Sequence, residues 1–468
     1  MSSRDLQQLL HSVLEELTEL KAKVDNLELT CKKQAKYIKE LQDENRDLKV
    51  KLNSNNSSLP PSSDIGTKPN KDRSLRPKSK KKTGGQPGHK GGKLKMVSNP
   101  KNTIDHKVSK CNSCDHDMSN EHQNIKSSRQ VFDLPPIKME VTQHNQYEAL
   151  CACCGHYNVA DYPVSVNKGQ TQYGPNIRAL VTYMSVRQYI PMSRIVEFLG
   201  TLVGQRISQG TVHNILKASS QRAQGVYTFI KNQIEQSKVV GADETGCNVR
   251  GEKHWAWVFQ TPLYTFLKIS DSRGYKVIED TFPNGLKNSI VVSDCWAAQL
   301  KTPSKGKQIC IPHIIRNLNE LKDRYQSKWA HQTKMILIRI MELCKSKRIP
   351  QHEKIKIEDE INILLDRPLT KSKKKVKLLL KRLKKHRNHI TTCLYRRYVP
   401  PDNNGSERAV RNMKVKVKIS GLFRSTEGAS NYATLRSLVD TAIKQGLSPF
   451  DVIIDPKILI TSELLTWT

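Results

Sequence analysis

The sequence has no long apolar run. No stretch of its 468 residues approaches the roughly 18–20 apolar residues of a membrane-spanning helix. The start, MSSRDLQQLL, also lacks the cationic head and apolar stretch of a signal peptide. These absences predict a soluble cytoplasmic protein without a membrane partner, whose eleven cysteines are thiols or metal ligands rather than disulfides.

Acidic residues are also scarce. Asp and Glu number 44 against 78 Lys and Arg, which leaves a formal net charge of +34. This excess predicts a polyanionic partner, because basic side chains release counterions when they neutralise phosphates. Charge alone does not separate DNA from RNA. The length predicts several structural units rather than one core.

Residues 1–53 carry a heptad pattern. Apolar residues recur at alternating steps of four and three from Leu6 to Leu52, and Asn45 occupies one a-type position. A pattern this long predicts a coiled coil, and hence a homo-oligomer. A single amphipathic helix packed on the body of the protein is the alternative.

Residues 54–104 are rich in Pro, Ser, Gly and Lys and poor in apolar residues. Such a composition cannot form a core and predicts a flexible basic linker. Lys80, Lys81 and Lys82 are the residues expected to follow a nucleic-acid backbone. A solvated linker with no partner would have the same composition.

Residues 105–165 contain two cysteine pairs with metal-ligand spacing: Cys111, Cys114, Cys151 and Cys154. Two thiolates separated by two residues form half of a tetrahedral zinc site, so the segment predicts a zinc ribbon. The intervening stretch RQVFDLPPIKMEVTQHNQYEAL alternates enough to supply a hairpin. Cys153 competes with its neighbours as a ligand.

Residues 166–235 have helical patterns. The stretch RIVEFLGTLVGQRISQGTVHNIL has the outline of a helix-turn-helix, with Ser208 as a candidate N-cap of the second helix. Such a pair can place a helix in the major groove of DNA. Ordinary helix packing gives the same pattern.

Residues 236–300 change to strand patterns. Three apolar segments at hairpin spacing, a short helix and a buried fourth strand predict the first part of an RNase H-like α/β core. In that fold an acid in the first strand lies beside an acid at the end of the fourth. These acids are Asp243 and Asp294.

Adjacent carboxylates repel unless a cation lies between them. Two divalent ions, Mg²⁺ or Mn²⁺, can hold both oxygens of an in-line phosphoryl displacement. A third acid on a later helix would complete such a site, and Glu407 has that position. Strand alternation directs Glu244 to the opposite face, and Asp402 falls in the loop before the helix.

Residues 301–395 are predicted to be a basic helical insertion whose charged faces touch nucleic acid, or are simply solvated. His313 and Arg316 stand about one helical turn apart and could contact the scissile phosphate, although His313 could equally be a packed core histidine. The second part of the core is predicted at residues 396–445, where Arg408 and Arg411 either hold phosphates or are solvent-exposed. A C-terminal tail, 446–468, follows.

Motifs spread over most of the chain resemble those of the DDE transposases of the insertion-sequence 66 family. They include GGQPGHKGG, the cysteine pairs, YGPNIRALVTYMSVRQYIPMSRIVEFL, ADETG, SDCW, CIPHIIRNL, DNNGSERAVRNMKV and SGLFRSTEGASNYATLRSLVDTAIKQG. Two positions depart from the pattern: Cys295 stands where glycine is common, and Pro312 where a small residue is usual.

The resemblance implies that Asp243, Asp294 and Glu407 form a metal-binding catalytic triad. It implies cleavage and joining of double-stranded DNA at terminal inverted repeats and at target DNA, with water and then a 3′-hydroxyl as nucleophiles. The resemblance also implies a bacterial, nucleoid-associated protein that works with accessory proteins of the same element. A nuclease of the same fold and a catalytically dead zinc-containing DNA-binding regulator are the alternatives. The predicted architecture is a multidomain α+β chain.

Overall fold

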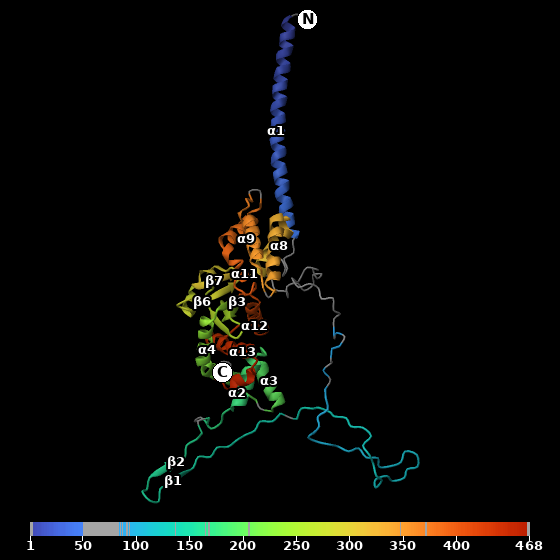
Figure 1. Cartoon of the computed structure of the whole chain (residues 1–468), viewed down its shortest axis with the longest axis vertical. Coiled ribbons are helices and arrows are strands. Elements are labelled where there is room, and N and C mark those ends of the chain that lie inside the picture. The colour runs from blue at the N-terminus through green and yellow to red at the C-terminus, as the bar shows by residue number, and fades with distance from the viewer. Residues whose placement is uncertain are drawn as a thin grey trace. The chain divides into compact units, whose positions relative to one another are not determined.

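The computed structural model describes residues 3–49, 84, 86, 88, 89, 92, 94–135, 137–163, 165, 166, 169–204, 206–346, 348–369 and 372–465 (Figure 1). Lys80, Lys81 and Lys82 lie outside these residues. The chain divides into two compact units. One unit comprises Met1–Arg73, Thr171–Ile195 and Gln209–Thr468, and the other Ser74–Gln170 and Val196–Ser208. Of the described helices, none combines the length and hydrophobicity needed to cross a bilayer.

The heptad segment forms one continuous helix, α1 (Ser3–Lys49), of 47 residues. It contains no Gly or Pro, the two residues that most disfavour a helix interior. Its apolar side chains remain exposed in the single chain, among them Leu17, Leu20 and Leu27.

In its described residues the second unit contains the strands β1 (Glu148–Leu150) and β2 (Tyr157–Val159), which pair antiparallel. This hairpin encloses the second cysteine pair. The prediction of a hairpin between the two cysteine pairs is wrong. Strand β1 begins only at Glu148, and the described residues between Cys114 and Glu148 contain no strand. The dipeptide Pro-Pro in DLPPIK interrupts that stretch, and proline cannot donate to a strand ladder.

The first unit is built around a five-stranded mixed sheet in the order β5-β4-β3-β6-β7. Strands β3, β6 and β7 are labelled in Figure 1. Its antiparallel part comprises β3 (Val239–Val249), β4 (Glu252–Gln260) and β5 (Thr265–Ser270). Strand β6 (Leu286–Ser293) pairs parallel with β3, and β7 (Ser304–Ile309) pairs parallel with β6. The short helices α5 (Lys276–Thr281) and α6 (Ala297–Lys301) lie in the connections.

Strand β7 corrects the predicted start of the helical insertion at residue 301. The segment SKGKQI pairs with β6, so the helices begin only after Ile309. Its lysines gave the segment the basic character of the predicted helical insertion. An edge strand tolerates such lysines, because one of its sides is unpaired.

Helices α4 (Gln209–Gln236), α12 (Asn404–Ser420) and α13 (Thr426–Lys444) pack on the sheet, α12 against β3 and α13 against β5. The buried hydroxyls of Thr441 and Ser437 on α13 accept hydrogen bonds from the backbone of β5, at 3.1 and 2.9 Å. Two more helices precede α4: α2 (Pro175–Val186) and α3 (Met192–Leu202).

The predicted C-terminal tail is helical and packed. It contains α14 (Pro449–Ile454) and α15 (Ile458–Leu465). Helix α14 packs on α2 and α13. Val452, Ile453 and Leu459 are buried, so the apolar positions of this segment belong to the core and not to a tail.

The inserted helices form a core of their own, which includes the buried Trp329, Leu337 and Ile357. They are α7 (Ile311–Tyr325), α8 (Lys328–Leu343), α9 (Gln351–Asp366), α10 (Lys374–Lys385), the 3₁₀ helix η2 (Arg387–His389) and α11 (Thr392–Tyr395). The Ile311 N–H donates to the carbonyl of Pro401 at 3.0 Å, so the chain leaves and re-enters the core at one point.

Candidate active site

Asp243 lies on β3, and Asp294 directly follows β6, the parallel neighbour of β3. The register of β3 and β6 pairs Val239 with Ile290 and Gly241 with Val292. Asp243 and Asp294 each lie two residues farther along, so they stand side by side at the end of the parallel ladder. Neighbouring strands are about 4.8 Å apart, a spacing at which the two carboxylates interact.

The environment of Asp243 disfavours its charge. Burial first, and then the carboxylates of Asp294 and Glu244, raise the pKa of Asp243 to about 8, with Glu407 adding a smaller effect. Oδ1 of Asp294 is buried and has no hydrogen-bond partner. A carboxylate pair with an unpartnered buried oxygen fits a bound divalent cation, which would satisfy that oxygen and offset the repulsion.

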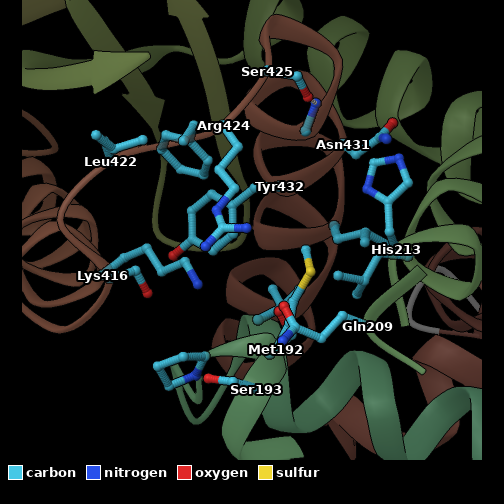
Figure 2. Close-up of a pocket in the computed structure, with 18 of the residues that line it drawn as sticks. Met192, Ser193, Gln209, His213, Lys416, Leu422, Arg424, Ser425, Asn431 and Tyr432 are labelled. Carbon is cyan, nitrogen blue, oxygen red and sulfur yellow. Dashed lines mark hydrogen bonds between the residues drawn. The ribbon is translucent and has the colours of Figure 1, made fainter. Parts of the chain in front are cut away.

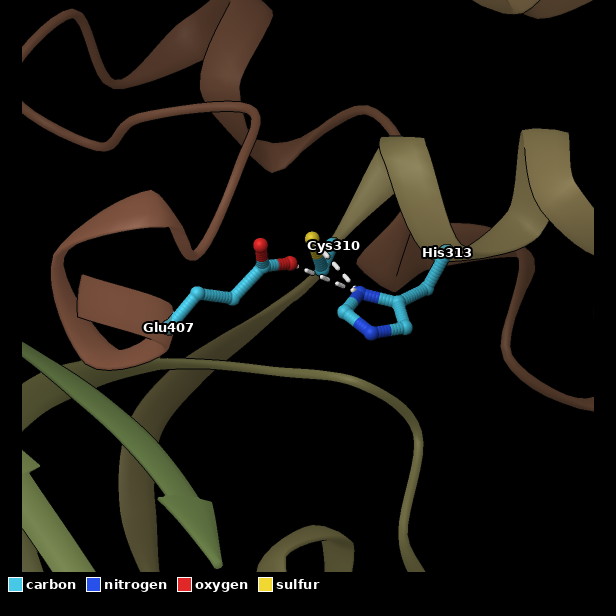
Figure 3. Close-up of side chains that lie close together, drawn as sticks. All are labelled: Cys310, His313 and Glu407. Atoms are coloured by element: carbon cyan, nitrogen blue, oxygen red, sulfur yellow. Dashed lines mark hydrogen bonds and ion pairs between the residues drawn. The ribbon is translucent and has the colours of Figure 1, made fainter. Parts of the chain in front are cut away.

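Glu407 approaches this pair from another element, the first turn of α12. Its Oε1 lies 3.5 Å from Nη2 of Arg316 and 3.6 Å from Nδ1 of His313, both on α7. Figure 3 shows Glu407 and His313 pointing toward each other, with Cys310 beside them. Glu407 therefore faces cationic and polar side chains of α7 as well as the sheet acids.

His313, Cys310 and Glu407 bring ligand-type atoms within 4.8 Å of one another. Nδ1 of His313 lies 3.2 Å from the Sγ of Cys310, and Nη1 of Arg316 lies 3.1 Å from Nε2. Because arginine can only donate, Nε2 is the acceptor and Nδ1 carries the proton of the neutral ring. Burial and then Arg316 lower the pKa of His313, which favours that neutral ring. The group is therefore a hydrogen-bond network, in which Nδ1 has no lone pair for a metal ion.

The two competing acids have other partners. Glu244 is buried, and its Oε1 forms an ion pair with Nη2 of Arg273 at 2.6 Å. Its Oε2 accepts from Nε2 of Gln299, also at 2.6 Å. Oδ1 of Asp402 accepts from the backbone N–H of Asn404 at 3.0 Å and so fixes the loop before α12.

The remaining predicted DNA contacts in the described part of the core lie on α12. Arg408 and Arg411 are both exposed on this helix, one and four residues after Glu407. Their guanidinium groups are thus open to solvent on the element that carries the third acid.

The two cysteine pairs form the same backbone turn. The N–H of Cys111 donates to the carbonyl of His116, and the N–H of Cys151 donates to that of His156. Hydrogen bonds from backbone N–H groups lower the pKa of Cys111 and of Cys151, which favours the thiolates that a metal ion needs. Among the described residues the four cysteines are not gathered into one cluster.

Comparison with known families identifies most of the chain. The profile of the transposase IS66 family matches residues 170–431, more than half of the sequence. The chain belongs to the IS66 transposase family. The zinc-finger binding domain of transposase IS66 matches residues 109–155 of this transposase, which supports a zinc ion in the second unit. A family of unknown function matches residues 10–95. No protein among the curated ones matches the chain.

Sequence analysis of this transposase missed Cys310 as part of the site and recognised only part of the role of Asn403. Cys310 is fully buried, and its Sγ accepts from the backbone N–H of Asn403 at 3.3 Å. The side chain of Asn403 donates to the carbonyl of Ala242 at 2.8 Å and thereby ties α12 to β3. The C-x-x-H spacing of CIPH was the available signal for Cys310.

Cys295, one of the two positions that depart from the pattern expected from the resemblance, has a φ of 75°. This left-handed conformation favours glycine. Cys295 adopts it directly after Asp294 and packs against the core of the inserted helices.

Proposed function

We propose that this transposase cuts and joins DNA at the terminal inverted repeats of its element, with Asp243, Asp294 and Glu407 as the catalytic triad. The three carboxylates would hold two Mg²⁺ or Mn²⁺ ions. The observation that carries this proposal is the side-by-side placement of Asp243 and Asp294, one with a raised pKa and the other with an unpartnered buried oxygen. When bound, such ions activate the attacking oxygen and stabilise the leaving oxygen.

The protein's own side chains set the position of the third acid. Nδ1 of His313 forms its hydrogen bond with Sγ of Cys310 at 3.2 Å and faces Oε1 of Glu407 at 3.6 Å, while Arg316 contacts both His313 and Glu407. A carboxylate held from two sides keeps one orientation, which pre-organisation for phosphoryl transfer requires. Arg408 and Arg411 are proposed to hold DNA phosphates beside the acids, since both are exposed on the same helix.

We infer that the core of the first unit is RNase H-like, with residues 236–300 and 396–445 as its predicted parts and β7 added to the first of them. Its three antiparallel strands followed by two parallel ones, in the order β5-β4-β3-β6-β7, support this assignment. The structure moves the proposed start of the helical insertion from 301 to Ile311.

The remaining segments are proposed to serve DNA capture. The exposed heptad seam of α1 supports a coiled coil between copies of the chain, since a contiguous apolar surface on a soluble helix calls for a partner. Residues 54–104, including Lys80, Lys81 and Lys82, would follow the DNA backbone, and residues 166–235 would contact the repeat. Cys111, Cys114, Cys151 and Cys154 would bind the zinc ion, and accessory proteins of the element would complete the assembly.

Purified transposase incubated with Mg²⁺ or Mn²⁺ and a labelled duplex of the flanking inverted repeat tests the proposal. Joined products support transposition, cleavage alone indicates a nuclease, and binding without cleavage indicates a regulator. Asp243→Asn, Asp294→Asn and Glu407→Gln should each abolish cleavage while DNA binding persists. Cleavage that survives in these variants would place the active site elsewhere.

A further inference from the structure

A second site lies farther along α12, in a cavity of about 480 Å³ within the first unit (Figure 2). Residues of α2, α4, α12 and α13 and the start of α3 line it, together with the segment between α12 and α13. The volume falls in the range of about 300–1,000 Å³ typical of small-ligand sites. Lys416 is nine residues after Glu407, which places it about 14 Å along the helix axis from the third acid.

The cavity contains cations without counterions. Lys416 and Arg424 both line it, and among the described residues neither forms an ion pair with a carboxylate. Nζ of Lys416 lies 5.7 Å from the centre of the Tyr432 ring, and burial lowers the pKa of this lysine to about 8. Figure 2 shows Lys416 and Arg424 extending toward Tyr432. An anionic group at this point would supply the missing charge.

Two hydroxyls of the cavity are also unsatisfied. Tyr432 is 5% exposed, and its buried hydroxyl has no hydrogen-bond partner. The buried hydroxyl oxygen of Ser420 also has no hydrogen-bond partner. Both residues line the cavity. Burial of a polar group without a partner is unfavourable, so a ligand that bonds to these hydroxyls gains affinity from them.

The other wall of the cavity is apolar and partly open. Ile419 and Leu422 line it and remain 45% and 44% exposed, while Met192 and Leu435 contribute further apolar surface. A flat ring would cover these side chains. Cations, unsatisfied hydroxyls and an apolar wall together describe a ligand with an anionic group attached to a planar ring.

We propose that this cavity binds a single nucleotide, with its phosphate at Lys416 and Arg424 and its base against Ile419 and Leu422. The source of the nucleotide rests on the proposed function: it is an unpaired nucleotide at the end of the DNA that the triad cleaves. A free nucleoside monophosphate offers the same chemistry and is the other source.

The test uses the full-length transposase and two duplexes of the flanking inverted repeat, one blunt and one with an unpaired terminal 2-aminopurine nucleotide. The wild type should bind the second duplex about tenfold more tightly and change the fluorescence of the base, since a charge-assisted contact is worth roughly a factor of ten. Lys416→Met and Arg424→Gln should each lose this preference and bind blunt DNA as before. Lys457→Met, an exposed lysine outside the cavity, should keep it.

Calorimetry with adenosine 5′-monophosphate distinguishes the two sources. One outcome is that the wild type binds adenosine 5′-monophosphate, that Lys416→Met weakens this binding, and that the protein shows no preference for the unpaired DNA end. This outcome supports the cavity as a site for a free nucleotide. Such binding in a protein that neither binds nor cleaves DNA would overturn the proposed function while supporting the cavity. The nucleotide site is overturned if the wild type neither prefers the unpaired DNA end nor binds adenosine 5′-monophosphate. It is also overturned if Lys416→Met and Arg424→Gln bind both ligands as the wild type does.

Discussion

Arg316 lies between His313 and Glu407, with Nη1 3.1 Å from the imidazole Nε2 and Nη2 3.5 Å from the carboxylate Oε1. One guanidinium thus fixes the tautomer of the histidine and contacts the acid that the histidine faces. The position of Glu407 consequently depends on a residue of α7 that belongs to a different part of the sequence.

We predict that Arg316→Gln slows DNA cleavage by roughly 10–100-fold, because a misplaced catalytic group costs about that much. DNA affinity should change little if the residue acts through Glu407. The measurement is single-turnover cleavage alongside equilibrium binding of the same duplex. Lys322→Gln, at an exposed position of α7, is the matched control and should cleave normally. Equal losses in rate and affinity would instead make Arg316 a DNA contact.

Asp294→Asn should stabilise the metal-free protein while it abolishes cleavage. The substitution removes a charge that helps to raise the pKa of Asp243, and like charges in proximity oppose folding. We expect a Tm increase of roughly 2 °C in chelator, and a smaller gain in Tm on adding Mg²⁺ than the wild type shows. Asp271→Asn, an exposed acid beyond β5, should change neither quantity.

Cys111→Ser should abolish stoichiometric zinc, whereas Cys153→Ser should retain it. The turn that starts at Cys151 repeats the turn that starts at Cys111, so Cys154 corresponds to Cys114 and Cys153 to Ser113. Elemental analysis of the purified variants measures zinc per chain. Loss of zinc from Cys153→Ser would reassign the ligand set.

Gly285→Ala should destabilise the first unit by at least about 2 kcal/mol. Gly285 has a φ of 69°, and an added Cβ would lie 2.7 Å from the carbonyl oxygen of Pro303. Urea unfolding measures the change. Gly246→Ala is the control, because its Cβ would meet nothing within 4 Å; this variant should stay within about 0.5 kcal/mol of the wild type or exceed it.

Lys444 predicts a pH dependence of stability. Its buried amine donates to Gln260 Oε1 at 2.8 Å and to two backbone carbonyls, and burial lowers the pKa to about 7. Between pH about 7 and about 10 the unfolded chain keeps a proton that the folded chain has released, so the free energy of unfolding rises with pH. Urea titrations should show a smaller rise for Lys444→Met than for the wild type. A variant with the wild-type slope would contradict the assignment, and Lys457→Met should retain that slope.

The sequence predicted the elements whose apolar pattern is regular. Alternation around Trp257 and Phe259 predicted β4, and the buried run of β6 predicted the strand before Asp294. Strand β7 was missed because Lys305 and Lys307 give this edge strand the basic character of the predicted helical insertion. The network of Cys310, His313 and Glu407 joins distant parts of the chain, and local periodicity contains no signal for such a contact.

The hydrogen bond between Ile311 and Pro401 has an evolutionary consequence. The inserted helices begin and end at adjacent points of the core and carry their own buried side chains. The helices after α7 can therefore change in number and length without altering the distance between the sheet and α12. Related elements could exchange these later helices as a module and acquire new DNA contacts, while α7 keeps Arg316 and His313 beside Glu407.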